Sequence, residues 1–156
     1  MSQEITVEER DPQIVVSTRF ECAASAMGDH FEKMLPPVYA YIEAQKGEVV
    51  GPPFVRYHAI FDNRYHLEVG LPVDRAMDAK AMMECNELPG GHAVVTTHVG
   101  PNKTLGKTHR AVRDWIRDHD QWTPTGAAWD FYLERPDDSD DASPRTKVFY
   151  PVKPAE

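Results

Sequence analysis

The sequence carries the same order of predicted elements twice. Each half has a strand-like run, a helix and two further strands, and the last strand ends in Leu71-Pro72-Val73 or Tyr150-Pro151-Val152. A repeated unit of this size buries its apolar face by combining with its neighbour. We therefore predict an α+β fold of two pseudo-symmetric β-α-β-β modules with mainly antiparallel sheet. The helices should lie on one face, and a ligand cleft should lie at the module junction, where ligands often bind between repeats.

The local patterns place these elements along the chain. We expect a single domain of 156 residues with module one at about 13–73, a linker at 74–90 and module two at about 91–153. The predicted strands are 13–22, 54–61, 65–71, 93–99, 128–133 and 146–152, and residues 1–12 should form a frayed lead-in. We predict helices at 36–45 and 105–119 and a short linker helix at 76–83. The first helix should begin at Pro36, because proline is tolerated in a first turn and not in a helix interior.

Composition excludes several classes of function. The formal net charge of -8 disfavours nucleic-acid binding, which needs clustered Lys and Arg, but permits a cationic ligand or a basic protein partner. The 2 cysteines and 7 histidines form no metal-binding motif, so we expect neither a metal nor a cofactor. There is no signal-peptide pattern and no long apolar run, so we expect a cytoplasmic protein without membrane contact.

The two halves also suggest how side chains divide between the faces of the sheet. Tyr41 aligns with Trp115, and the same offset aligns Arg56 with Asp130. Because strand residues alternate between faces, we assign one set to the core under the helices. That set is Val55, Tyr57, Ala59, Phe61, Leu67, Val69, Trp129, Phe131, Leu133, Val148 and Tyr150. The opposite set is Arg56, His58, Glu68, Asp130, Tyr132, Lys147 and Phe149.

This second set mixes charged and aromatic residues on a face that no predicted helix covers. Such a composition suits a wet groove for an aromatic or amphipathic ligand, and it also suits a solvent-exposed sheet face. Glu68 or Asp130 could pair with a cationic ligand, or one of them could act as a general base on water. Arg56 and Lys147 could neutralise either acid across the strands, and spacing does not choose between these roles.

Several segments together resemble a known family. They are 67–73 (LEVGLPV), 87–91 (ELPGG), 98–101 (HVGP), 129–133 (WDFYL) and 146–152 (TKVFYPV). In their order and spacing, these segments are similar to the gyrase-inhibitor-like (GyrI-like) family. This small-molecule-binding domain is also the effector-binding half of multidrug-responsive transcription activators.

The resemblance implies two β-α-β-β modules with a ligand cleft at their junction. It also implies binding of bulky, often cationic aromatic compounds through aromatic side chains and an acid. Some members modulate DNA gyrase, and one branch hydrolyses electrophilic compounds. Two positions depart from the family pattern, since Asp130 stands where Glu is frequent and Lys147 stands where an acid is frequent.

Three hypotheses follow. The first, which we favour, is a standalone small-molecule-binding protein, since the chain is too short to include a DNA-binding domain as well. Its ligand-binding residues would be Asp130, Tyr132, Glu68, His58, Arg56, Phe149 and Lys147. The second is a hydrolase that uses Glu68 or Asp130. The third is a protein that binds a basic partner such as gyrase through its acidic surface, including the loop at 137–141.

Overall fold

The computed structural model of the chain describes residues 4–80, 82–135 and 143–156, and the chain folds into two compact modules. The first module is Pro12–Pro89, and the second module combines Met1–Asp11 with Gly90–Glu156. The acidic loop at 137–141, which the sequence offered as a partner-binding surface, lies outside the described residues.

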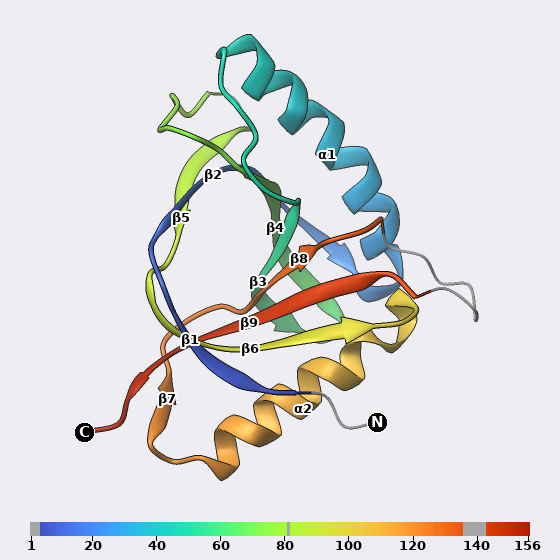
Figure 1. Ribbon diagram of the computed structural model, residues 1–156. Coiled ribbons are helices and arrows are strands. Elements are labelled where there is room, and N and C mark those ends of the chain that lie inside the picture. Colours follow the sequence, from blue (N-terminus) through green and yellow to red (C-terminus); the bar gives the residue numbers. More distant parts are fainter. Residues whose placement is uncertain (1–3, 81, 136–142) are drawn as a thin grey trace. The chain divides into compact units, whose positions relative to one another are not determined.

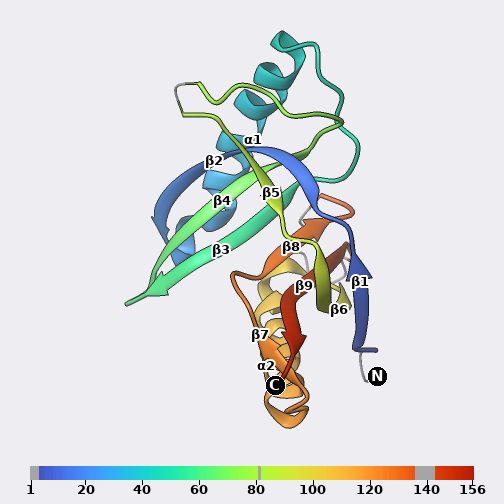
Figure 2. The ribbon, with the colours of Figure 1, turned by 90° about the vertical axis from the view of Figure 1, so that its left-hand side faces the viewer.

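The first module is an antiparallel sheet with one long helix. Its elements are β2 (Gln13–Ala23), a 3-10 turn (Ala24–Ala26), α1 (Met27–Ala44), β3 (Phe54–Phe61), β4 (Arg64–Pro72) and β5 (Glu84–Leu88). The strands lie in the order β3-β4-β2-β5, all antiparallel. In Figures 1 and 2, α1 lies along one side of this sheet, where it packs on β2 and β4.

The second module repeats this arrangement. Its elements are β1 (Thr6–Arg10), β6 (Gly91–Val99), a 3-10 turn (Asn102–Thr104), α2 (Leu105–Asp118), β7 (Trp122–Pro124), β8 (Trp129–Tyr132) and β9 (Arg145–Pro154). The strands lie in the order β8-β9-β6-β1, with β7 paired to β9. Thus β8, β9, β6 and β1 take the places that β3, β4, β2 and β5 take in the first module. The predicted α+β fold with mainly antiparallel sheet is confirmed.

Two edge strands were not predicted. Residues 6–10 were expected to be a frayed lead-in, but they pair with β6, and residues 84–88 of the expected linker pair with β2. Both segments are short and largely polar, so they lack the apolar alternation that marks a half-buried strand. The described residues of 76–83 are not helical, and Lys80 and Met83 form an antiparallel bridge instead.

The first helix is longer than the sequence predicted. It starts at Met27 and continues through Pro36 and Pro37, so the expectation that it begins at Pro36 was wrong. Each interior proline removes one backbone hydrogen bond, but both prolines lie on the exposed side. The helix is held instead by the packing of its buried side. By contrast, α2 is close to the helix predicted at 105–119, and it buries Leu105, His109, Val112 and Ile116.

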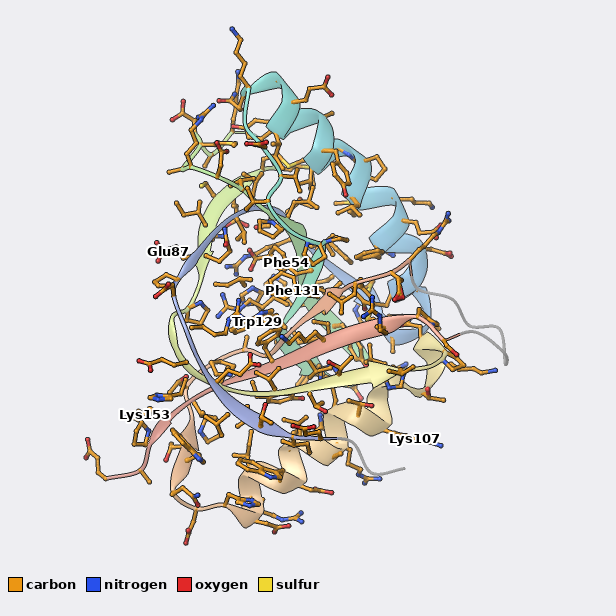
Figure 3. All side chains as sticks on the ribbon, viewed as in Figure 1. Phe54, Glu87, Lys107, Trp129, Phe131 and Lys153 are labelled. Atoms are coloured by element: carbon orange, nitrogen blue, oxygen red, sulfur yellow. The ribbon has the colours of Figure 1, made fainter. Side chains whose placement is uncertain are left out.

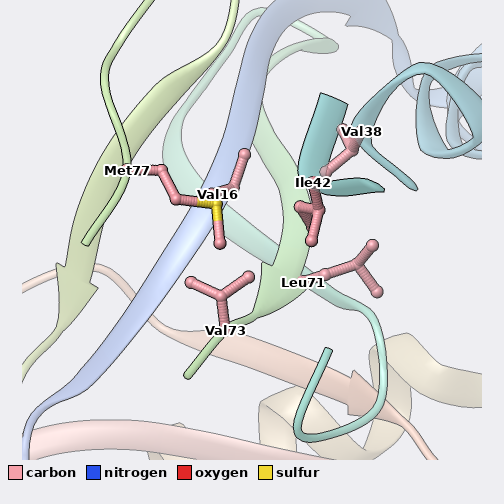
Figure 4. Close-up of a cluster of buried hydrophobic side chains, with 6 residues drawn as sticks. All are labelled: Val16, Val38, Ile42, Leu71, Val73 and Met77. Carbon is pink, nitrogen blue, oxygen red and sulfur yellow. The ribbon is translucent and has the colours of Figure 1, made fainter. Parts of the chain in front are cut away.

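An apolar cluster joins α1 to its sheet (Figure 4). It contains Val16, Val38, Ile42, Leu71, Val73 and Met77, all buried. Each of these side chains contributes roughly 1.5–3 kcal/mol to folding by leaving water. At Gly70 the neighbouring strand comes close, since an added Cβ would lie 2.1 Å from the carbonyl oxygen of Val16.

In the part of the chain that the structure describes, neither α1 nor α2 nor any shorter helix combines the length and hydropathy of a membrane-spanning segment.

Candidate functional site

The packing of each helix divides its sheet into two faces. In the first module, Val16 and Leu71 are paired across β2 and β4 and pack with Ile42 of α1, so they mark the helix face. Glu68 is three residues before Leu71 on β4, and side chains alternate along a strand. Glu68 therefore lies on the side away from α1, which we call the helix-free face, as the sequence predicted.

Glu68 is the centre of a polar cluster on this face. Its side chain is only 1% exposed. Ser17 Oγ donates to Glu68 Oε2 at 2.5 Å, and Asn86 Nδ2 donates to the same oxygen at 3.4 Å. His58 Nε2 lies 2.6 Å from Glu68 Oε1. Arg56 of β3 is the cross-strand partner of Glu68. We call Ser17, Arg56, His58, Glu68 and Asn86 the Glu68 cluster.

The cluster keeps the Glu68 carboxylate ionised. Burial by itself raises the pKa of Glu68, but the hydrogen bonds from Ser17, His58 and Asn86 and the attraction of His58 outweigh that effect. The pKa of Glu68 is therefore below its ordinary value of 4.5. Burial lowers the pKa of Arg56, although the attraction of Glu68 opposes this shift. A guanidinium remains protonated in proteins, so a positive charge stands beside the buried carboxylate.

A β-bulge positions His58. Tyr57 pairs with Leu67 and Ala59 pairs with His66, so His58 is the extra residue of β3. The bulge also shifts the alternation by one residue beyond this point. The prediction that Ala59 and Phe61 continue the core under the helix was therefore wrong, and Phe61 is 80% exposed.

In the second module, Asp130 is directed at its own helix. The carboxylate is fully buried, and its two oxygens lie 2.9 and 3.0 Å from His109 Nε2 on α2. His109 Nδ1 lies 2.7 Å from the Tyr150 hydroxyl, to which Arg113 donates at 3.2 Å. Burial raises the pKa of Tyr150, and the attraction of Arg113 opposes that shift. These polar contacts fasten α2 to β8 and β9.

The assignment of side chains to faces from the sequence was partly wrong in this module. Asp130 pairs with Val148 and Tyr132 with Thr146, so Asp130 and Tyr132 lie on the helix face. Lys147 and Phe149 lie on the helix-free face, and their strand partners there are Phe131 and Trp129. The expectation that Asp130 and Tyr132 share a face with Lys147 and Phe149 was therefore wrong, as was the placing of Trp129 and Phe131 under the helix. Leu133 is 37% exposed and lies beyond the end of β8.

The physical reason is a one-residue error in aligning the halves. Phe54 pairs with Gly70 and Trp129 pairs with Phe149, which makes Val55 the counterpart of Asp130. The sequence alignment had matched Arg56 with Asp130. A shift of one residue moves every side chain of a strand to the other face.

The helix-free face of the second module carries a buried aromatic cluster of Trp129, Phe131 and Phe149, flanked by cations. The rings of Trp129 and Phe149 stack at 5.4 Å, and Phe131 meets Phe149 edge to face at 5.6 Å. Figure 3 labels Trp129 and Phe131 on β8. Arg10 of β1 lies over the Phe149 ring with its Cζ 4.4 Å from the centroid, and Lys147 Nζ lies 5.5 Å from the same centroid.

Thus the structure joins Arg56, His58 and Glu68 in one cluster, and Lys147 with Phe149 in another. Sequence reasoning missed Ser17, Asn86, Arg10 and His109. Asn86 and Arg10 lie on the two edge strands that were not predicted. To find these two residues, the sequence would have needed an apolar alternation that marked both segments as strands. Within residues 4–80, 82–135 and 143–156, no three His, Cys, Asp or Glu side chains are placed to hold a metal ion. Ligand binding by the seven predicted residues, and a cleft at the module junction, stay predictions.

The two modules define a class of protein. It is a duplicated α+β domain in which a helix covers one face of each sheet and polar or aromatic side chains occupy the other. The chain belongs to the family of GyrI-like small molecule binding domains, whose family model matches residues 3–153. No curated protein sequence is significantly similar to it.

Two solved structures with the same fold come from EcmrR. The C-terminal domain of EcmrR has a TM-score of 0.84 at 20% identity, and the match covers 99% of this chain and 100% of that one. EcmrR in a complex with DNA has a TM-score of 0.82 at 18% identity, covering 98% of this chain and 58% of that one. This chain thus spans little more than half of that EcmrR chain.

Two other neighbours are a ligand-bound protein and a hydrolase. SAV2435, solved with bound tetraphenylphosphonium, has a TM-score of 0.62 at 15% identity, covering 96% of this chain and 94% of that one. A hydrolase from Listeria innocua has a TM-score of 0.68 at 12% identity, covering 96% of this chain and 92% of that one. At these identities the likeness establishes the fold.

Proposed function

We propose that the chain is a receptor for amphipathic, aromatic small molecules, and that the Glu68 cluster holds the polar part of the ligand. The observation that carries this proposal is the buried, ionised Glu68 carboxylate on the face that α1 leaves free. A buried charge is costly unless hydrogen bonds and a counter-charge satisfy it. Two side chains that donate to Glu68, Ser17 and Asn86, come from different strands, so the sheet presets the geometry of the carboxylate.

The family supports the binding class, and one neighbour indicates a kind of ligand. SAV2435 has been solved with tetraphenylphosphonium, a bulky aromatic ion. Among the residues of this chain, the Glu68 cluster offers polar groups in the first module, and Trp129, Phe131 and Phe149 offer rings in the second. A cationic ligand, which the family resemblance implied, needs a carboxylate that is not already neutralised by side chains of the protein. Glu68 already has His58 and Arg56 beside it.

A thermal-shift screen of aromatic dyes of either charge tests the proposal. At ligand concentrations of ~100 times Kd, linkage predicts about 2.7 kcal/mol of added stability. Glu68→Gln should weaken binding of the best dye at least several-fold. The matched control is Glu87→Gln, because Glu87 is exposed on β5 and carries the same charge. If no dye stabilises the protein, or if both variants bind equally well, the proposal is wrong.

Hydrolysis of an electrophile is the second candidate, and the Glu68–His58 contact of 2.6 Å favours it. A general base works best with a pKa near the working pH, whereas the pKa of Glu68 is lowered. We therefore rank hydrolysis below binding. Turnover of an activated aryl ester that disappears in Glu68→Gln and persists in Glu87→Gln would reverse this order. Docking on a basic protein through the loop at 137–141 stays a third hypothesis, and that loop lies outside the described residues.

A further inference from the structure

Two cations of the chain itself contact the aromatic cluster of the second module. Arg10 and Lys147 both lie within 5.5 Å of the centroid of the Phe149 ring. Phe149 is only 1% exposed, and the rings of Trp129 and Phe131 also contact it. A cation on the face of a ring is attracted by the ring's negative quadrupole. The position that a cationic ligand would take on Phe149 is therefore already filled.

The two cations differ in how far they are neutralised. Lys147 Nζ has a carboxylate oxygen of Glu8 at 3.9 Å, at the limit of an ion pair. Within the part of the chain that the structure describes, Arg10 makes its ring contact and no ion pair. Its guanidinium is half-buried and retains donors that can meet an anionic group in a fixed fork.

Lys147 also lines a hollow of about 350 Å³. The other lining residues are Glu4, Thr6, Glu8, Val95, Thr96 and Thr97. Glu4 and Glu8 oppose an incoming anion, but Glu8 is directed at Lys147. The negative charge of the rest of the chain is screened over about 10 Å at 0.1 M salt, whereas contacts at Arg10 are not.

We propose that the helix-free face of the second module selects aromatic anions over aromatic cations, and that Arg10 and Lys147 are the residues that determine this charge preference. The inference rests on the proposed receptor function and adds a charge preference that residues of the second module determine. An anionic group placed against Arg10 gains a charge-assisted contact, and a cation in the same place is repelled by two like charges.

Tetraphenylborate and tetraphenylphosphonium are the probes, because they have nearly the same shape and opposite charge. Isothermal titration in a sodium buffer measures both dissociation constants. The borate should bind the unaltered protein roughly tenfold or more tightly than the phosphonium. In the double variant Arg10→Gln, Lys147→Gln, that ratio should fall about tenfold, and Arg10→Gln alone should account for most of the change.

The control double variant is Lys107→Gln, Arg110→Gln. It removes the same charge from the exposed side of α2, where Figure 3 labels Lys107, and it should leave the ratio within about twofold. Circular dichroism checks that each variant is folded. If the double variant does not fold, Arg10→Gln alone and the loss of borate binding in high salt provide the test.

The outcomes separate the two proposals. Tighter binding of the phosphonium, or an equal change of the ratio in both double variants, overturns the charge preference and leaves the receptor function standing. Binding of neither ion, together with no stabilising dye, overturns both.

Discussion

Replacing Glu68 with Gln should destabilise the first module far more than its small change in shape suggests. Gln has nearly the same volume but no charge, so the charge-assisted hydrogen bonds from Ser17 at 2.5 Å and His58 at 2.6 Å become neutral ones. Each such change costs about 1 kcal/mol, because hydrogen bonds to ionised groups are worth roughly twice neutral ones. Arg56 also loses the negative charge beside it, which adds on the order of 1 kcal/mol. We expect a total loss of about 3 kcal/mol at pH 7.

The same reasoning fixes the pH dependence. The pKa of Glu68 is lowered in the folded state from its ordinary value of 4.5. A lowered carboxyl pKa means that the unfolded chain binds a proton more readily, so its contribution to stability is present above the ordinary pKa. The contribution is lost as the pH falls through the folded-state pKa. The difference in stability between the protein and Glu68→Gln should therefore be largest near neutral pH and shrink in acid.

Urea unfolding followed by circular dichroism, at neutral pH and at a series of acidic pH values, measures this difference. Glu87→Gln is the control, since Glu87 is exposed and lies on β5, the edge strand of the same module's sheet. It should change the free energy of unfolding by less than about 0.5 kcal/mol. A Glu68→Gln protein within about 0.5 kcal/mol of the unaltered one at pH 7, or a difference that grows in acid, would refute the account of the Glu68 cluster.

Other predictions concern the backbone and the second module. Gly70→Ala should lower the free energy of unfolding by about 3 kcal/mol or more, because its Cβ would lie 2.1 Å from the carbonyl oxygen of Val16. Gly106→Ala on α2 meets open space and should raise that free energy by about 0.5–1 kcal/mol in the same urea assay. Tyr150→Phe should cost about 1–2 kcal/mol, because the hydroxyl contacts His109 and Arg113. In an ultraviolet titration, Tyr150 should ionise above the ordinary tyrosine pKa of 10.0, and the absorbance step that Tyr150→Phe removes should be that late one. Removal of an early step instead would contradict the assigned burial.

Much of the fold could be predicted because it depends on local pattern. The stripe of Leu105, His109, Val112 and Ile116 has helical spacing, and α2 forms there. The alternation of Arg56 and Glu68 against Val55 and Leu67 placed the first pair on the helix-free face, as the sheet register confirms. These features depend on periodicity within a few residues, which the sequence contains in full.

Other features depend on partners that are distant in the sequence. The strands at 6–10 and 84–88 form by pairing with the edges of β6 and β2. The composition of these two segments does not by itself predict a strand. The continuation of α1 through Pro36 and Pro37 depends likewise on its packing against the sheet.

The sequence by itself determined that the chain repeats an α+β unit and which family it resembles, since both are carried by the order and spacing of residues. Only the tertiary structure decided which side chains share a face. The pairing of Asp130 with Val148 directs Asp130 to His109 and leaves Lys147 with Phe149 and Arg10. Side chains alternate between the two faces of a sheet, so an error of one residue in the strand register moves every side chain of that strand to the other face. The register is set by backbone hydrogen bonds between strands, and the sequence alone does not show which residues these bonds pair.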